Sequence, residues 1–188
     1  MMDREFRQWR GATAVLITGG LVWIAQSGLA VVFQPDYWDP RTVVEYTAVA
    51  GTSIALILLA VGVWAIHLRQ RPQGRWRTWL WRVGIILACS GALVAGIANF
   101  GEDWIAIKSL GIFFVVGSLA TFVGLLLAGI SAIGAAGNTR WTGWLLIACF
   151  LGWGSVDLGG GFVVGIALIS LGIGQSRLVQ SGRLNQAN

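Results

Sequence analysis

Two apolar stretches joined by a short acidic turn decide the fold of this chain. From residue 82 to residue 136 they read RVGIILACSGALVAGIANFGEDWIAIKSLGIFFVVGSLATFVGLLLAGISAIGAA. Small residues recur at every fourth position in each stretch, which places them along one face of a helix. The first row is Gly84, Ala88, Ala92 and Gly96, and the second is Ala120, Gly124, Ala128, Ala132 and Ala136. Small residues let two backbones approach closely in lipid, so the stretch predicts a tightly packed pair of helices.

The composition of the whole chain extends this interpretation. Of 188 residues, 56% are hydrophobic and 11% are charged, and the mean hydropathy is +0.73. Soluble domains carry roughly 25% charged residues, so these values indicate an integral membrane protein. The long apolar runs lack the alternation of a membrane β-barrel, which predicts an all-α protein with a single transmembrane domain over residues 1–188.

Apolar runs that are long enough to cross a hydrocarbon core of about 30 Å define the predicted spans. The expected ranges are 12–33, 43–66, 80–99, 108–134, 142–156 and 160–175. The first run is too long for the apolar region of a signal peptide, so we expect it to be retained as a span. The most natural fold is therefore a bundle of six transmembrane helices arranged as three hairpins.

The last stretch, residues 141–176, leaves an alternative open. Polar residues and three glycines, Gly159 to Gly161, divide it into two short segments. Each is shorter than the usual spanning helix, so the pair either crosses as two mismatched spans or dips in and returns as a re-entrant hairpin. The alternative fold is then four spans and a re-entrant C-terminal hairpin.

The distribution of charge predicts the orientation. The N-terminal segment, the loop 67–82, the turn at Arg140 and the tail hold eleven arginines against Asp3 and Glu5. The alternate loops hold six acids against Arg41 and Lys108. By the positive-inside rule, both termini are cytoplasmic and the number of spans is even. We expect the cytoplasmic membrane of a bacterium as the location.

The loop 67–82 mixes arginine and tryptophan, a combination that also occurs in nucleic-acid-binding proteins. Between two spans, the mixture is more typical of a cytoplasmic interface, where arginine meets anionic lipid headgroups and indoles occupy the headgroup region. We therefore expect no nucleic acid and assign these arginines to lipid. The basic residues in question are Arg69, Arg71, Arg75, Arg77 and Arg82.

Catalytic, metal and cofactor motifs are not evident. The chain has one histidine, His67, which excludes a haem held by two histidines. The two cysteines, Cys89 and Cys149, lie in apolar segments and are expected to be buried structural thiols. The sequence therefore predicts no enzyme activity and no cofactor.

Polar residues converge on the predicted outer side of the membrane. Polar groups within a bilayer are costly unless they are paired or hydrated. They therefore indicate either ordinary headgroup contacts or a shallow acidic pocket for a cation or cationic solute. Asp157 would matter most to such a pocket, because short segments flank it. The candidate pocket residues are Gln26, Glu45, Asn99, Glu102, Asp103, Lys108 and Asp157.

Two functions of different classes follow. The first is a non-catalytic accessory or scaffold module that acts through helix packing, with other membrane subunits or further copies of itself as partners. The second is a small transporter or channel with an acidic outer mouth. A faint repeat favours the second, since Phe114-Val115-Val116-Gly117 matches Phe162-Val163-Val164-Gly165 and transport folds are often built from repeats.

Overall fold

The computed structural model describes residues 2–35, 40–70, 72–105, 107–135, 138–155 and 160–187. Side chains are described for these residues except 2–10, 138 and 177–187. Within the described chain every regular element is a helix, which confirms the all-α prediction. The elements are α1 (Met2–Phe33), α2 (Val43–His67), α3 (Arg75–Trp104), η1 (Lys108–Leu110), α4 (Gly111–Ile133), α5 (Asn138–Trp153) and α6 (Gly160–Ala187).

Local sequence explains where several helices begin and end. Gln34, with φ 44°, ends α1 directly before Pro35, and Thr42 caps the first turn of α2. Pro72 precedes α3, and Gly74, with φ 100°, adopts the left-handed backbone that leads into this helix. The predicted segment 108–134 is divided, because η1 forms its first turn and α4 the remainder.

Four helical segments are long and apolar enough to cross a membrane, judged by length and composition. They are Gly11–Phe33, Val43–His67, Arg75–Trp104 and Lys108–Ile133. The apolar part of α6, Gly160–Ser176, is shorter, and α5 has 16 residues. At 1.5 Å per residue, α5 is about 24 Å long, somewhat less than the hydrocarbon core.

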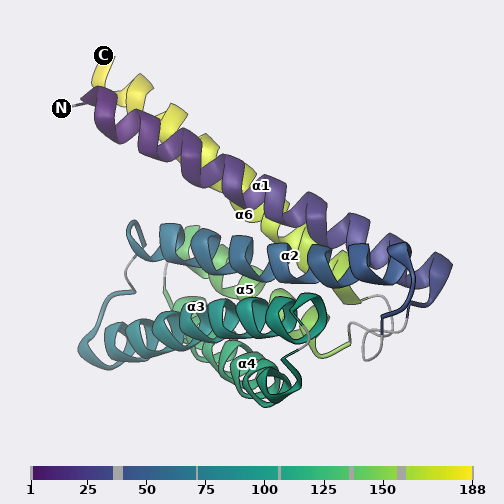
Figure 1. Ribbon diagram of the computed structural model, residues 1–188. Helices are drawn as coiled ribbons and strands as arrows, with labels where there is room; N and C mark the ends of the chain where they lie inside the picture. The colour runs from purple at the N-terminus through teal and green to yellow at the C-terminus, as the bar shows by residue number, and fades with distance from the viewer. Residues whose placement is uncertain are drawn as a thin grey trace.

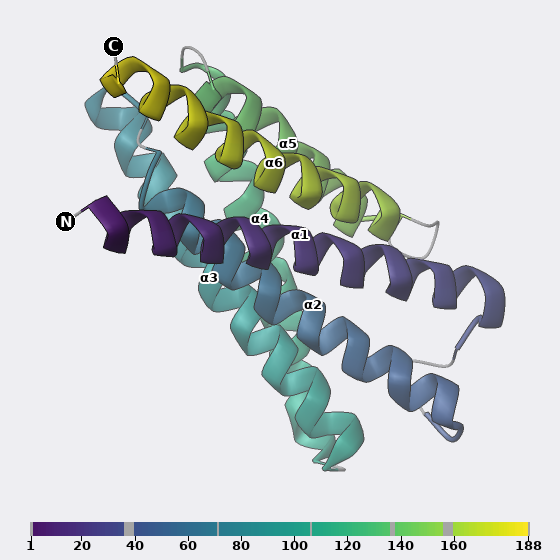
Figure 2. The same ribbon diagram turned by 90° about the horizontal axis from the view of Figure 1, so that it is seen from above.

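The six α-helices form a closed ring. Each of them packs on the helix before it and the helix after it, and α6 returns to pack on α1 (Figures 1 and 2). In Figure 1, both marked chain ends lie at the same end of the pair formed by α1 and α6. Figure 2 shows that these two helices lie close together near the start of α6 and diverge towards the marked ends. Sequential neighbours therefore account for five contacts of the ring and α1–α6 for the sixth.

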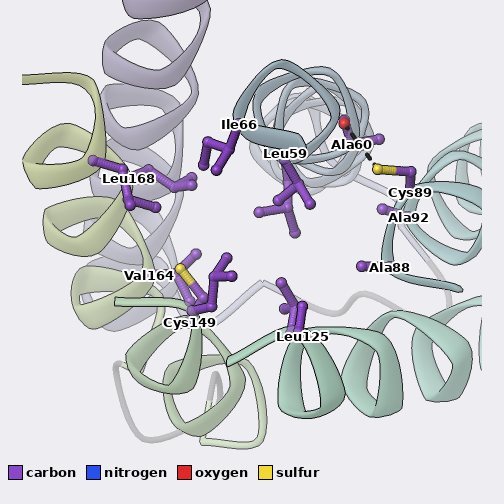
Figure 3. Close-up of a cluster of buried hydrophobic side chains, with 14 of the residues drawn as sticks. Leu59, Ala60, Ile66, Ala88, Cys89, Ala92, Leu125, Cys149, Val164 and Leu168 are labelled. Atoms are coloured by element: carbon purple, nitrogen blue, oxygen red, sulfur yellow. Dashed lines mark hydrogen bonds between the residues drawn. The ribbon is translucent and has the colours of Figure 1, made fainter. Parts of the chain in front are cut away.

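Apolar side chains fill the centre of the ring. Leu59 of α2, Leu125 of α4, Cys149 of α5 and Val164 of α6 point towards one another, with Leu168 beside them (Figure 3). Each of these residues is at most 2% exposed. The centre is therefore a packed apolar core.

The two ends of the ring differ in charge. One end, here called the arginine end, contains residues 68–70, residues 72–77 and the start of α5 at residues 138–140. The opposite end, called the acidic end, contains residues 40–45, 101–105 and 107–110. Arg77 at the start of α3 donates a hydrogen bond to the carbonyl oxygen of Gly134, which ties the two connections at the arginine end together.

The last predicted segment, 160–175, begins at the same residue as α6. Gly160 and Gly161, two of the three glycines that divide the stretch 141–176, form the first turn of this helix. Both are buried, and a Cβ atom on Gly160 would collide with the carbonyl oxygen of Gly152 on α5. These glycines allow the start of α6 to lie against its neighbours. Residues 156–159 lie outside the described part.

Candidate functional site

The small-residue row predicted on α3 is divided between two neighbouring helices. Gly84 and Ala88 lie against α4, because a Cβ atom on Gly84 would be 2.5 Å from the backbone nitrogen of Ala128. A Cβ atom on Gly124 would collide with the backbone nitrogen of Ala88. Gly96 instead faces α2, since its added Cβ would lie 3.0 Å from the carbonyl oxygen of Ser53. The row therefore does not form a single interface.

Helix geometry explains this division. Four residues turn an α-helix by about 400°, so a row with four-residue spacing winds around the helix by about 40° at each step. A row with alternating steps of four and three residues remains facing one partner. The observed row on α3 has these steps, Gly84, Ala88, Gly91 and Ala95, and it faces Gly117, Thr121, Gly124 and Ala128 of α4.

The remaining predicted packing residues are buried to different degrees. Ala92 is fully buried, and Ala120 is half-buried. Ala132 is buried beside α5, because a Cβ atom on Gly143 would lie 2.9 Å from its carbonyl carbon. Ala136 lies outside the described residues.

Reciprocal glycine contacts recur around the ring. A Cβ atom on Gly91 would lie 2.5 Å from the carbonyl oxygen of Gly117, and one on Gly117 would lie 2.7 Å from that of Gly91. The same mutual approach joins α1 to α6 through Gly20 and Gly165, at 2.5 and 2.6 Å. Such close contacts allow Cα–H groups to face carbonyl oxygens across the interface. Further pairs of this kind are Gly84 with Gly124, Gly129 with Gly143, and Gly152 with Gly160.

These glycine pairs connect the helices in the order α3, α4, α5, α6 and α1. The pairs outside α3 and α4 were not predicted from the sequence. For α3 and α4, the alternating four- and three-residue spacing of the small residues was the available signal. The two matched Phe-Val-Val-Gly segments also differ in their partners, since Gly117 meets α3 and Gly165 meets α1. The matched glycines therefore occupy different positions relative to the ring.

The helix α2 is held by other means. The side chain of Leu16 of α1 packs on Gly62 of α2. A Cβ atom added to Gly62 would lie 2.6 Å from the Cδ2 atom of Leu16. From α3, Cys89 donates a hydrogen bond of 3.3 Å to the carbonyl oxygen of Ala60. Side-chain packing and polar contacts thus hold α2 on both sides.

Two of the predicted pocket residues serve helix ends and helix contacts. Glu45 accepts hydrogen bonds of 2.7 Å from the backbone of Arg41 and of Thr42, and the Thr42 hydroxyl accepts one from the Glu45 backbone. This reciprocal arrangement is a capping box. Asn99 of α3 donates hydrogen bonds to the carbonyl oxygen of Val49 and, at 2.9 Å, to the hydroxyl of Ser53.

Gln26 lies between α1 and α2. It is 5% exposed, and its Oε1 atom would be 2.6 Å from a Cβ on Gly51. Its amide is therefore directed at the backbone of α2. Gln26 is part of a helix contact, as Asn99 is.

Glu102, Asp103 and Lys108 are the pocket residues that lie together. The carboxylate of Glu102 lies against the start of α4, with Oε1 2.6 Å from a Cβ placed on Gly111. A negative charge at that position is favoured by the helix dipole. Asp103 is close enough to Glu102 and Lys108 to interact with both charges, and Lys108 is exposed. Asp157, the residue expected to matter most, lies outside the described part of the chain.

The described basic residues of the loop 67–82 line the arginine end. Arg75, Arg77 and Arg82 are exposed, as are Trp76 and Trp79, whose rings stack with centroids 5.5 Å apart. Arg69 is half-buried, and desolvation lowers its pKa to about 10, which leaves the guanidinium charged at neutral pH. Arg71 lies outside the described residues. Exposed arginine and tryptophan side chains at one end of an apolar bundle fit a membrane interface.

Buried polar side chains near this end were missed by the sequence reasoning. Gln70 follows α2, Trp81 lies on α3 and Gln175 lies on α6, and they are 8%, 0% and 4% exposed. Gln70 Oε1, Trp81 Nε1 and Gln175 Oε1 have no hydrogen-bond partner among the described residues. We call these three residues the inner polar layer. The available signal was their spacing, since each continues an apolar row of its helix.

Comparison with known proteins identifies no relative. No family model, no curated protein and no solved structure matches this chain. The function must therefore be argued from the residues and their arrangement.

Proposed function

We propose that this protein is a non-catalytic membrane module that acts through helix packing, as an accessory subunit or scaffold. The observation that carries the proposal is the reciprocal glycine contact, which occurs at four of the neighbouring helix pairs in the ring. Much of the small-residue content is thereby used to bring backbones together. The apolar centre of the ring serves the same purpose.

We further propose that all six α-helices span the membrane. The helix α6 packs on α1, which is itself long enough to cross, and α5 packs on both α4 and α6 (Figures 1 and 2). A re-entrant pair would leave part of α1 without its neighbour. The short length of α5 is accommodated by local thinning of the bilayer or by tilt of its neighbours.

The same proposal assigns the arginine end to the cytoplasm of a bacterium, where anionic headgroups meet the exposed arginines. Both termini then lie on the cytoplasmic side. The acidic end faces outwards. Partners are expected within the bilayer, as another membrane subunit or a second copy of the chain.

The alternative function is a small transporter or channel for a cation or other solute. It would require a polar route through the ring, whereas Leu59, Leu125 and Val164 occupy the centre. The predicted acidic mouth is also divided, because Glu45 caps α2 and Gln26 faces α2. These observations support placing the packing module first.

Purification in mild detergent tests the proposal. We expect a second membrane chain, or a second copy of this one, to co-purify in a fixed ratio that mass spectrometry and light scattering measure together. A monodisperse monomer that mediates cation or solute flux in proteoliposomes would contradict the packing module and favour the transporter.

A further inference from the structure

The inner polar layer lies on the core-facing rows of its helices. On α6, Val164, Leu168 and Leu171 are buried at steps of four and three residues, and Gln175 follows four residues later. On α2, Leu59, Val63 and Ile66 form the same kind of row, and Gln70 continues it. Positions with this spacing share one face of a helix, so Gln175 lies on the core-facing side of α6. Gln70 lies three residues past the end of α2, and its side chain is buried, at 8% exposed.

The three residues also lie towards the arginine end of the ring. Leu16 of α1 packs against both Gly62 of α2 and Gly172 of α6, which places those two glycines at one level. Gln175 is three residues beyond Gly172, and Gln70 is eight residues beyond Gly62. The backbone N–H of Gln70 donates a hydrogen bond to the carbonyl oxygen of Ile66, which holds Gln70 just past the end of α2. The ring of Trp81 stacks on His67, the last residue of α2, with centroids 6.3 Å apart. The layer therefore occupies about two turns of helix at the arginine end.

A buried layer of polar groups without hydrogen-bond partners is energetically unfavourable. Burying an amide oxygen or an indole N–H group without a hydrogen-bond partner costs free energy, because the group loses its bonds to water. The layer presents two acceptors and one donor in this condition. Water can donate to the glutamine oxygens and accept from the indole, and it is available at the end of the ring.

The helix α2 is the element whose movement would admit water. It is the ring helix for which no reciprocal glycine contact is described, and Gln70 follows its last residue, His67, at the arginine end. The helices that carry Gln175 and Trp81 are each fixed to a neighbour through glycine pairs. Movement at the end of α2 can therefore expose the layer without separating those pairs.

We propose that the ring opens at the His67 end of α2, which is the arginine end. The inner polar layer then binds water and forms a hydrated vestibule. The vestibule ends at the apolar centre formed by residues such as Leu59 and Leu168. It does not depend on the proposed packing function, since a scaffold and a transporter can both contain it.

Cysteine accessibility in proteoliposomes tests the proposal. Gln70→Cys and Gln175→Cys are made in a chain carrying Cys89→Ala and Cys149→Ala, and each is treated with a small, water-soluble methanethiosulfonate reagent. Gln73→Cys, at an exposed glutamine of the same loop, gives the rate for open water. Leu168→Cys gives the rate for the apolar centre. We expect both layer variants to react at least tenfold faster than Leu168→Cys.

A further pair of positions locates the opening. Ile66→Cys on α2 is expected to react measurably, whereas Ala132→Cys, at the contact of α4 with α5, is expected to react as slowly as Leu168→Cys. If Gln70→Cys and Gln175→Cys are as slow as Leu168→Cys, the vestibule is refuted. If Ala132→Cys reacts as fast as Gln175→Cys, opening at α2 is refuted.

Hydrogen–deuterium exchange on the unmodified protein provides a test that needs no variant. Amides of residues 63–70 are expected to exchange at least tenfold faster than those of residues 84–91 on α3. Equal protection of the two segments would overturn the opening of α2, whatever the folding of the cysteine variants.

Discussion

A single glycine shows how closely the backbones of α3 and α4 approach. A Cβ atom on Gly124 would collide with the backbone nitrogen of Ala88, and backbone atoms cannot move aside as a flexible side chain can. Gly28 on α1 has nothing within 4 Å of the corresponding position. The same substitution at these two glycines should therefore have opposite effects.

We predict that Gly124→Ala lowers the stability by about 1–3 kcal/mol, as overpacking does. Gly28→Ala should be neutral or raise the stability by up to about 1 kcal/mol, because alanine is the better helix former. Thermal unfolding in a mild detergent measures both. Equal melting temperatures for the two variants would mean that α3 and α4 are not in close contact.

The Asn99 side chain provides a second test at this scale. Asn99→Ala removes the hydrogen bonds from α3 to Val49 and Ser53 of α2, and interhelical bonds of this kind contribute about 0.6 kcal/mol in membrane proteins. Ser90→Ala is the control, because the Ser90 hydroxyl bonds to carbonyl groups of its own helix. We expect a lower melting temperature for Asn99→Ala alone. An equal fall in the melting temperature of Ser90→Ala would show that the hydrogen bonds of Asn99 between α3 and α2 contribute no specific stability.

At the scale of the helix, the N-terminus of α2 depends on the capping box of Thr42 and Glu45. Thr42→Val removes the side-chain acceptor for the Glu45 backbone N–H, which should cost about 0.5–2 kcal/mol. Thr47→Val is the matched control, because the Thr47 hydroxyl donates to the carbonyl oxygen of Val43 within the helix. Hydrogen exchange of residues 43–46 should accelerate only in Thr42→Val. Unchanged exchange would show that the cap does not hold this end.

Apolar run length placed the helical segments approximately, but several ends and the interfaces could not be predicted. The helix α3, for example, extends five residues beyond the range 80–99 at each end, into polar and aromatic sequence. The range 43–66 differs from α2 by one residue at its end, because the run is bounded by Thr42 and the loop after His67. The packing rows were predicted with one spacing, whereas the contacts follow another. The length of an apolar run depends on local composition. Which of two neighbouring helices a small residue contacts depends on how the helices are oriented in the bundle.

The candidate pocket could not be predicted for a related reason. The sequence places Glu45, Asn99 and Gln26 on the same outer side, but each engages a different part of α2. Glu45 caps its start, Asn99 donates to the carbonyl oxygen of Val49, and Gln26 faces Gly51. Depth can be read from position within an apolar run. The direction in which a side chain points around the helix axis has meaning only relative to the neighbouring helices. The sequence does not give those neighbours, whereas the closed ring of the structure does.

At the scale of the whole molecule, the proposed topology has direct consequences for labelling. Reporter fusions or cysteine labelling should place residues 72–77 in the cytoplasm and Glu102 outside, because of the arginine bias at the first segment and the acids at the second. A reporter after Asn188 should be active only on the cytoplasmic side. Activity of that reporter on the outside would contradict an even number of spans.

The contact between α1 and α6 also governs the order in which the protein can be assembled. During synthesis, α3 and α4 emerge one after the other and can pair early, since only a short turn separates them. Gly20 of α1 must wait for Gly165 until four intervening helices have been inserted. Until then, the partner face of α1 is covered by lipid or by the insertion machinery. In the proposed topology, the ring therefore closes only after α6 has been inserted, and a ribosome that stalls before α6 leaves a nascent chain whose first helix is still unpaired on that face.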